Sequence, residues 1–256
     1  MHEFSYLYGT LSVGVFWLFF FVIRPDLRKD MLLLSFLFGI GGVTSEYCYA
    51  RDWWSPETLT GTMIGVEDFM FGFFFGGATS TCYEVIFSQT SATRNSKPTI
   101  PTRLRYIALT ICTIFFGSTV LLELHSFTAT VLSFGFCILV FLWQRPDLVR
   151  QAIIGALFGL LMSFLFFGIP VSINNGWIES AWSLKNLSGL FVFYMPVEDV
   201  LWFTIAGAFI APLLNFWKNR VSLDAATAPI ISCSAEIPGP VHTNSDRSAA
   251  APNKAS

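Results

Sequence analysis

Charged side chains are scarce in this sequence. They account for 12% of its 256 residues, whereas soluble domains carry about 25%. The sequence also lacks a dense basic cluster for nucleic acid, a dinucleotide fingerprint, a phosphate-binding loop and an aspartate-rich motif for a metal and diphosphate. It therefore argues against a water-exposed globular domain, against nucleic-acid binding and against a nucleotide or metal cofactor.

Metal-like cysteine spacing is missing as well. The five cysteines include no Cys-x-x-Cys pair, and most lie in apolar runs, where a thiol behaves as a small hydrophobic group. We therefore predict neither a disulfide nor a metal site. Because no basic segment precedes the first apolar run, that run is expected to remain as a membrane span rather than be cleaved as a signal peptide.

Apolar residues are in excess. They make up 54% of the chain, with 28 phenylalanines, and they gather in runs long enough to cross a hydrocarbon core of about 30 Å. Backbone polar groups in lipid must bond within their own segment, so these runs should be helices. The sequence predicts an all-α integral membrane protein with seven transmembrane helices, at residues 6–23, 31–49, 61–80, 104–122, 127–143, 152–169 and 193–217.

Basic residues predict the orientation of these spans. The first, third and fifth loops, together with the C-terminal segment, hold thirteen lysines and arginines, and the opposite side holds only Arg51 and Lys185. Positive loops stay in the cytoplasm. We expect a multi-pass protein of the plasma or inner membrane with its N-terminus outside and its C-terminus inside, which requires an odd number of spans.

Three short motifs recur in the same order in both halves of the chain. "RPDL" occurs at residues 24–27 and 145–148, "LFG" at 37–39 and 157–159, and "VED" at 66–68 and 197–199. They predict two parallel three-helix repeats, residues 1–89 and 127–220, joined by a linker with the fourth span at 90–126. Residues 221–256 have too few apolar side chains to pack and are expected to form a disordered cytoplasmic tail.

Each repeat sets an acidic pair, Glu67–Asp68 or Glu198–Asp199, into the outer part of an apolar helix. Equivalent depth in two parallel repeats would let both pairs face one shared cavity. Neighbouring helix residues point about 100° apart, so one acid of each pair should face the cavity while the other orients it or bonds elsewhere. Alternatively, the acids mark helix N-termini, where the helix dipole favours negative charge, and Pro196 suits that interpretation.

Further side chains extend this candidate site. Phe71 and Trp202 lie one turn below the acids, where an aromatic face would attract a cation; an aromatic belt facing lipid is the alternative. Glu46 lies at similar depth, and its counterpart in the other half is Phe166 or Phe167. We regard Glu46 as either a substrate-binding or an interfacial residue.

Other features are assigned structural roles. Gly72 and Gly76 permit close helix packing, and Trp53 and Trp54 are predicted interface anchors. Glu84 is expected to be solvated. The arginines and aspartates of the two "RPDL" segments are expected to end helices through local ion pairs.

These motifs resemble the lycopene cyclase domain family, in which a Pro-(Val/Leu/Ile)-Glu-(Glu/Asp) segment opens an apolar helix twice in a seven-span protein. "MPVEDVLWF" at 195–203 matches closely, with Asp199 in place of the second Glu. "IGVEDFMF" at 64–71 has Gly65 where proline is usual, and "SEYCYARDWW" at 45–54 resembles the glutamate and tryptophan segment before the motif. The resemblance spans about residues 1–217.

The resemblance implies acid-catalysed cyclisation of a linear carotene end group, with a hydrophobic polyene or isoprenoid substrate, no net redox change and no cofactor. It implies that Glu67, Asp68, Glu198 and Asp199 are catalytic, and Glu198 is our choice for the acid. A homo-oligomer is compatible with these features.

Two other functions compete with cyclisation. A transporter or proton-relay protein would also use paired intramembrane acids. A prenyl-chain transferase would need the missing aspartate-rich motifs.

Overall fold

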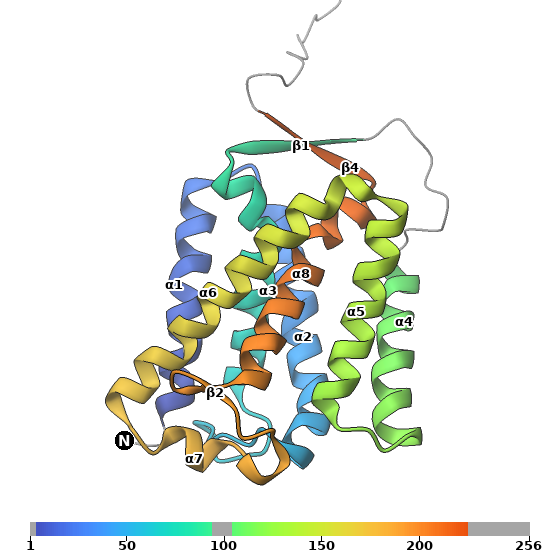
Figure 1. Cartoon of the computed structure of the whole chain (residues 1–256). Coiled ribbons are helices and arrows are strands. Elements are labelled where there is room, and N and C mark those ends of the chain that lie inside the picture. Colours follow the sequence, from blue (N-terminus) through green and yellow to red (C-terminus); the bar gives the residue numbers. More distant parts are fainter. Residues whose placement is uncertain (1–3, 94–103, 225–256) are drawn as a thin grey trace, which may run out of the picture.

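The computed structural model describes residues 4–93 and 104–224. Long helices run side by side in an elongated bundle (Figure 1). The helices are α1 (Ser5–Ile23), α2 (Arg28–Asp52), α3 (Val66–Ile86), α4 (Leu104–Phe116), α5 (Ser126–Gln144), α6 (Val149–Ile173), α7 (Trp177–Ala181) and α8 (Val197–Trp217). The short strands are β1 (Gln89–Thr93), β2 (Phe191–Val192), β3 (Met195–Pro196) and β4 (Arg220–Asp224). Strands β1 and β4 lie at one end of the bundle and α7 at the other; we call these the β1/β4 end and the α7 end.

Six of the predicted segments form helices that are candidate membrane spans. Among the described residues, α1, α2, α5, α8, α4 with its continuation to Leu121, and α6 with the turn before it are long and apolar enough to cross a bilayer. The remaining predicted span corresponds to α3, which begins at Val66 rather than at residue 61. Its second half carries buried polar side chains, such as Thr79 and Glu84. Helix α3 packs against α1, α2, α6 and α8, so these residues meet other helices rather than lipid.

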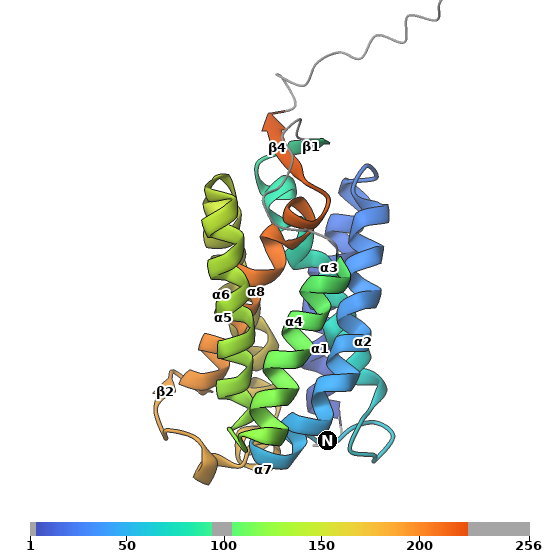
Figure 2. The same ribbon diagram turned by 90° about the vertical axis from the view of Figure 1, so that its right-hand side faces the viewer.

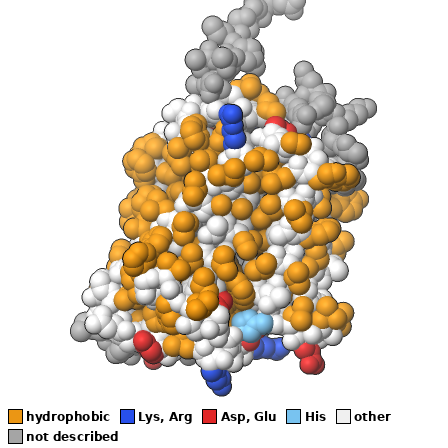
Figure 3. Space-filling view, in the orientation of Figure 1, with side chains coloured by type: hydrophobic (Ala, Val, Ile, Leu, Met, Phe, Trp, Pro, Cys, Tyr) orange, Lys and Arg blue, Asp and Glu red, His pale blue; other side chains and the backbone are white. Residues whose placement is uncertain are grey.

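The outer surface of the bundle is largely apolar. Figure 3 shows hydrophobic side chains over the middle of one face, with most of the visible charged side chains near the two ends. Leu139 on α5 and Val120 next to α4, for example, are 71% and 63% exposed. A surface of this kind suits contact with lipid rather than water.

Glycine lets two helix pairs approach closely. A Cβ atom at Gly72 of α3 would lie 2.2 Å from the carbonyl oxygen of Phe38 on α2, and one at Gly159 of α6 would lie 2.1 Å from the carbonyl oxygen of Phe203 on α8. At Gly76 a Cβ atom would lie 2.3 Å from that of Phe38. The predicted packing role of Gly72 and Gly76 is confirmed, because the α2–α3 contact leaves no space for a side chain at either position.

The "RPDL" arginines end helices as predicted. Arg24 donates to both carboxyl oxygens of Asp26, at 2.9 and 2.7 Å, and Arg145 binds Asp147 in the same way at 2.9 and 2.6 Å. The hydrogen bonds from Arg24 lower the pKa of Asp26. We did not predict a second role for these arginines. Arg24 also donates to the carbonyl oxygen of Glu84 at the end of α3, and Arg145 to that of Asn215 at the end of α8 (3.4 Å), where a cation suits the helix dipole.

The β1/β4 end is closed by strand pairing that the sequence analysis missed. Strand β1 follows α3, strand β4 follows α8, and the two pair antiparallel from Gln89–Asp224 to Thr93–Arg220. Lys218 and Arg220 both bind Asp30 at the start of α2. The predicted tail therefore does not begin at residue 221; residues 225–256 lie outside the described part of the chain.

Two loops pair across the α7 end. Trp54 and Trp182 form an antiparallel bridge, flanked by backbone hydrogen bonds from Ser55 to Ala181 (2.8 Å) and from Ser183 to Trp53 (2.9 Å). The Trp54 and Trp182 rings lie 4.3 Å apart between centroids. Trp53 is only 4% exposed. The predicted interface-anchor role is therefore wrong for Trp53, which faces the interior.

Candidate active site

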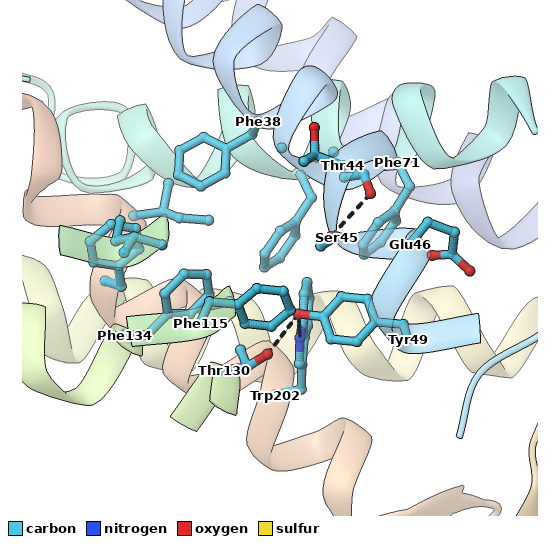
Figure 4. A pocket seen from close by; sticks show the side chains of 18 of the residues that line it. Phe38, Thr44, Ser45, Glu46, Tyr49, Phe71, Phe115, Thr130, Phe134 and Trp202 are labelled. Atoms are coloured by element: carbon cyan, nitrogen blue, oxygen red, sulfur yellow. Dashed lines mark hydrogen bonds between the residues drawn. The ribbon is translucent and has the colours of Figure 1, made fainter. Parts of the chain in front are cut away.

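A cavity of about 430 Å³ lies inside the bundle, between α2 and α3 on one side and α4, α5 and α8 on the other. Most of its wall is aromatic or aliphatic (Figure 4). Three acids line it, Glu46 of α2, Asp68 of α3 and Asp199 of α8, and the loop residues Trp54 and Trp182 line it near them. The cavity therefore combines a hydrocarbon-like wall with carboxyl groups at its α7 end.

Asp68 has a hydrogen-bond donor for each of its oxygens. The Tyr6 hydroxyl donates to Oδ1 at 2.7 Å, and the Gly65 backbone N–H donates to Oδ2 at 2.7 Å. The second bond caps the N-terminus of α3. These two donors offset part of the cost of burying a negative charge at the cavity wall.

Asp199 lacks this arrangement, for a reason visible in the sequence. The residue equivalent to Gly65 is Pro196, which has no N–H to donate. Asp199 is 7% exposed, and its Oδ2 has no hydrogen-bond partner among the described residues. The two acidic pairs are therefore alike in sequence but differ in hydrogen bonding.

The glutamate of each pair points elsewhere. Glu67 Oε1 accepts a hydrogen bond from the Leu59 backbone N–H (2.7 Å), and Glu198 Oε1 accepts one from the Ser188 backbone N–H (2.6 Å). Both side chains are buried, but neither lines the cavity. Each glutamate holds the loop that precedes its own helix. This includes Glu198, our choice for the acid, which bonds to the loop and does not line the cavity.

Glu46 joins the cavity acids from the middle helix of the first half. It is 3% exposed, and its Oε1 has no hydrogen-bond partner within the described ranges. Its carboxyl group interacts electrostatically with that of Asp68. Phe166 lines the cavity from the corresponding helix of the second half, so the two halves contribute different chemistry.

Phe71 and Trp202 both line the cavity, with ring centroids 6.0 Å apart. Hydrogen bonds fix Trp202: its indole N–H donates to the Tyr49 hydroxyl at 3.1 Å (Figure 4). Tyr49 lies 2.7 Å from the Thr130 hydroxyl, which itself donates to the Ser126 carbonyl oxygen at 2.9 Å. Sequence reasoning missed Tyr49, although its spacing of three residues from Glu46 puts both on one helix face.

Glu84 is not solvated, contrary to our prediction. It is 4% exposed and lies at the β1/β4 end, where its Oε1 accepts hydrogen bonds from Asn215 Nδ2 (2.7 Å) and Ser222 Oγ (2.8 Å). This polar cluster joins α3, α8 and β4, away from the cavity acids. Its contacts give Glu84 a structural role.

The described residues contain no group of three or more His, Cys, Asp or Glu arranged to hold a metal ion.

Comparison of the chain with known proteins gives one match, to a family model. No curated protein and no solved structure matches the chain. A family model described as lycopene cyclase matches residues 5–86 and 125–217, which hold α1–α3 and α5–α8 and therefore every acid at the cavity. The chain belongs to the lycopene cyclase family.

Proposed function

We propose that this protein is a membrane carotenoid cyclase that closes a ring at the end of a linear carotene without net redox change. The observation that carries the proposal is Asp199, a buried carboxyl group with an unpartnered oxygen at the wall of an apolar cavity. A buried acid with an unpartnered oxygen is best accommodated in its neutral form. A neutral carboxylic acid beside a polyene is a proton donor.

In the proposed reaction Asp199 gives its proton to the terminal double bond of the polyene. The resulting tertiary cation is attacked by an internal double bond, so one carbon–carbon bond forms and the charge moves into the new ring. A carboxylate then removes a ring proton and a double bond is restored. We assign this last step to Asp68, which is charged in the proposal, and proton exchange among the acids resets the site.

The aromatic wall supports the cationic steps. Phe71 and Trp202 present rings to the cavity, and ring faces attract cations most strongly where water is excluded. Trp53, Trp54 and Trp182 cover the α7 end, which would keep water from trapping the cation. Glu46, adjacent to Asp68, completes the acidic end and would help to position the reacting double bond.

For the architecture we propose two parallel repeats, α1–α3 and α5–α8, with α4 as the linker. Equivalent contacts in both halves support this: the arginine caps on α3 and α8, the glutamate bonds to the preceding loops, and the glycine contacts of α2–α3 and α6–α8. The charge distribution supports an outside N-terminus, with the β1/β4 end in the cytoplasm.

The transporter alternative fits the cavity less well. A proton or ion route would need polar groups from the cavity acids to the polar cluster at Glu84. The cavity wall toward that end is instead apolar, with Leu34, Phe209 and Leu213. We therefore favour chemistry within the cavity over transport through it.

Expression in a bacterial host that accumulates lycopene tests the proposal. Pigments are extracted and separated by chromatography, and the protein in the membrane fraction is quantified. We expect lycopene to be replaced by products of the same mass with one or two end rings. Unchanged lycopene, with the protein folded in the membrane, would overturn the proposal.

A further inference from the structure

The cavity opens through the side of the bundle, between α2 and α4. Ile40, Gly41 and Thr44 of α2 line it and are also exposed on the surface, as are Ala108 and Cys112 of α4. Figure 2 shows the bundle from this side, with α4 and α2 next to each other. We call this opening, lined by these five residues, the α2/α4 mouth.

The mouth lies at the depth of the hydrocarbon core. At 1.5 Å per residue, Gly41 is about 16–20 Å from either end of α2, and the apolar core of a bilayer is about 30 Å thick. Helices α2 and α4 are both among the membrane-span candidates. The mouth therefore faces lipid chains, whereas the α7 end of the cavity is covered by paired loops.

The hydroxyl groups of α2 in the mouth and next to it donate hydrogen bonds within their own helix. The Thr44 hydroxyl donates to the Ile40 carbonyl oxygen at 2.7 Å, and the Ser45 hydroxyl donates to that of Gly42 at 3.0 Å. A passing hydrocarbon would break no hydrogen bond there, and a water-soluble ligand would find both of these hydroxyl hydrogens already donated. At the far end of the same cavity, Glu46 and Asp199 each keep a buried oxygen without a partner in the described residues.

We infer that the α2/α4 mouth admits one end of a long isoprenoid chain directly from the bilayer, an inference that rests on the proposed function. The end group reaches the acids, and the rest of the chain extends through the mouth into lipid. A volume of about 430 Å³ is toward the lower end of the roughly 300–1,000 Å³ that holds a drug-sized ligand, so a long polyene reaches out of the cavity.

Gly41 makes this inference testable without disturbing packing. A Cβ atom there would meet no other atom within 4 Å, in contrast to Gly42, where it would lie 2.6 Å from the Asp68 carbonyl oxygen. Gly135 on α5 is a matched control: a Cβ atom there is equally free, and Gly135 does not line the cavity. Gly41→Phe should narrow the mouth, and Gly135→Phe should add the same ring elsewhere on the bundle.

The first experiment measures initial rates of lycopene consumption in membranes that hold equal amounts of each protein. We expect Gly41→Phe to lower the rate by about tenfold or more and Gly135→Phe to leave it within about twofold of the unmodified protein. Gly41→Ala should fall between the two. If Gly41→Phe turns over as fast as Gly135→Phe, the mouth is not the route.

A second experiment tests whether lycopene occupies the α2/α4 mouth and does not require turnover. Cys112 is exposed at the mouth, and a cysteine introduced by Leu139→Cys on the lipid-facing side of α5 serves as the reference. We expect added lycopene to slow alkylation of Cys112 by a lipophilic maleimide and not to affect the reference cysteine, as measured by peptide mass spectrometry. Equal rates with and without lycopene would overturn the inference. Slowed alkylation in a protein that forms no rings would support the mouth and reject the cyclase proposal.

Discussion

The two acidic pairs differ in whether a backbone N–H group is available three residues before the aspartate. Gly65 has that group and gives it to Asp68, whereas Pro196 lacks it and Asp199 keeps an unpartnered oxygen. Proline at this position fixes the backbone at the start of α8. It also removes the N–H group that would otherwise donate a hydrogen bond to Asp199. In the proposed reaction, Pro196 therefore also affects the chemistry of Asp199, three residues further along the chain.

Asp199→Asn and Glu198→Gln form a decisive pair of variants. Asp199→Asn removes the proposed proton and should abolish ring formation. Glu198→Gln keeps an oxygen that can accept the Ser188 N–H, so it should retain most of the activity. Chromatography of pigments from cells with equal membrane levels of both variants gives the answer. The opposite pattern would return the role of acid to Glu198.

Tyr49→Phe tests the hydrogen bond that holds Trp202. The variant keeps the ring but loses the hydroxyl that accepts from the indole N–H. We expect kcat to fall several-fold with little change in KM, because a displaced ring stabilises the cation less and leaves binding of the chain intact. The thermal unfolding temperature should fall only modestly, since the two neutral hydrogen bonds lost, to Trp202 and Thr130, contribute about 1 kcal/mol each. An unchanged kcat would show that Trp202 needs no such support.

At the scale of elements, α3 and α8 are each held at both ends by contacts with other segments. Arg24 and Arg145 bind the last carbonyl groups of α3 and α8, and loop N–H groups bind the glutamates in their first turns. Much of this was open to prediction. Hydropathy predicted the helices, and the repeated motifs predicted which helices carry the acids.

Contacts between distant segments could not be predicted from the sequence. The Tyr6–Asp68 bond joins residues 62 apart, and the Tyr49–Thr130 bond joins residues 81 apart. The start of α3 was also missed, because residues 61–65 continue an apolar run and Gly65 alone marks the boundary. Hydropathy reports whether a segment prefers lipid, but it does not distinguish which side of a helix meets another helix.

Arg145→Met should destabilise the protein through the end of α8. The Arg145 side chain is 5% exposed, and charged hydrogen bonds of this kind contribute about 2–3 kcal/mol, so we expect a clear fall in the unfolding temperature in detergent. Arg51→Met at the opposite end is the control, because Arg51 is exposed. Equal unfolding temperatures for the two variants would contradict the capping role.

At the scale of the whole molecule, the two ends differ in the kind of contact that closes them. The β1/β4 end uses a strand pair and ion pairs to Asp30. The α7 end uses aromatic rings and loop backbone. Basic residues are concentrated toward the β1/β4 end, and on that ground we propose that this end faces the cytoplasm.

Reporter fusions test that direction. Alkaline phosphatase, which is active only outside the cytoplasm, should be inactive when fused at the C-terminus and active when inserted beside Lys185. Fluorescent protein fusions at the same two positions should give the reverse pattern. Activity of the phosphatase at the C-terminus would mean that the bundle has the opposite orientation.

The side opening of the cavity has a consequence for the order of products. A symmetrical polyene has two reactive termini, and in the proposed binding mode only one lies beside Asp199 while the other remains among the lipid tails. Each ring closure therefore requires a separate binding event, and the product with one ring must dissociate and bind again with its other end in the cavity. During a time course the amount of the one-ring product should rise and then decline as the two-ring product appears. Its maximum amount would indicate how often the one-ring product dissociates without binding again.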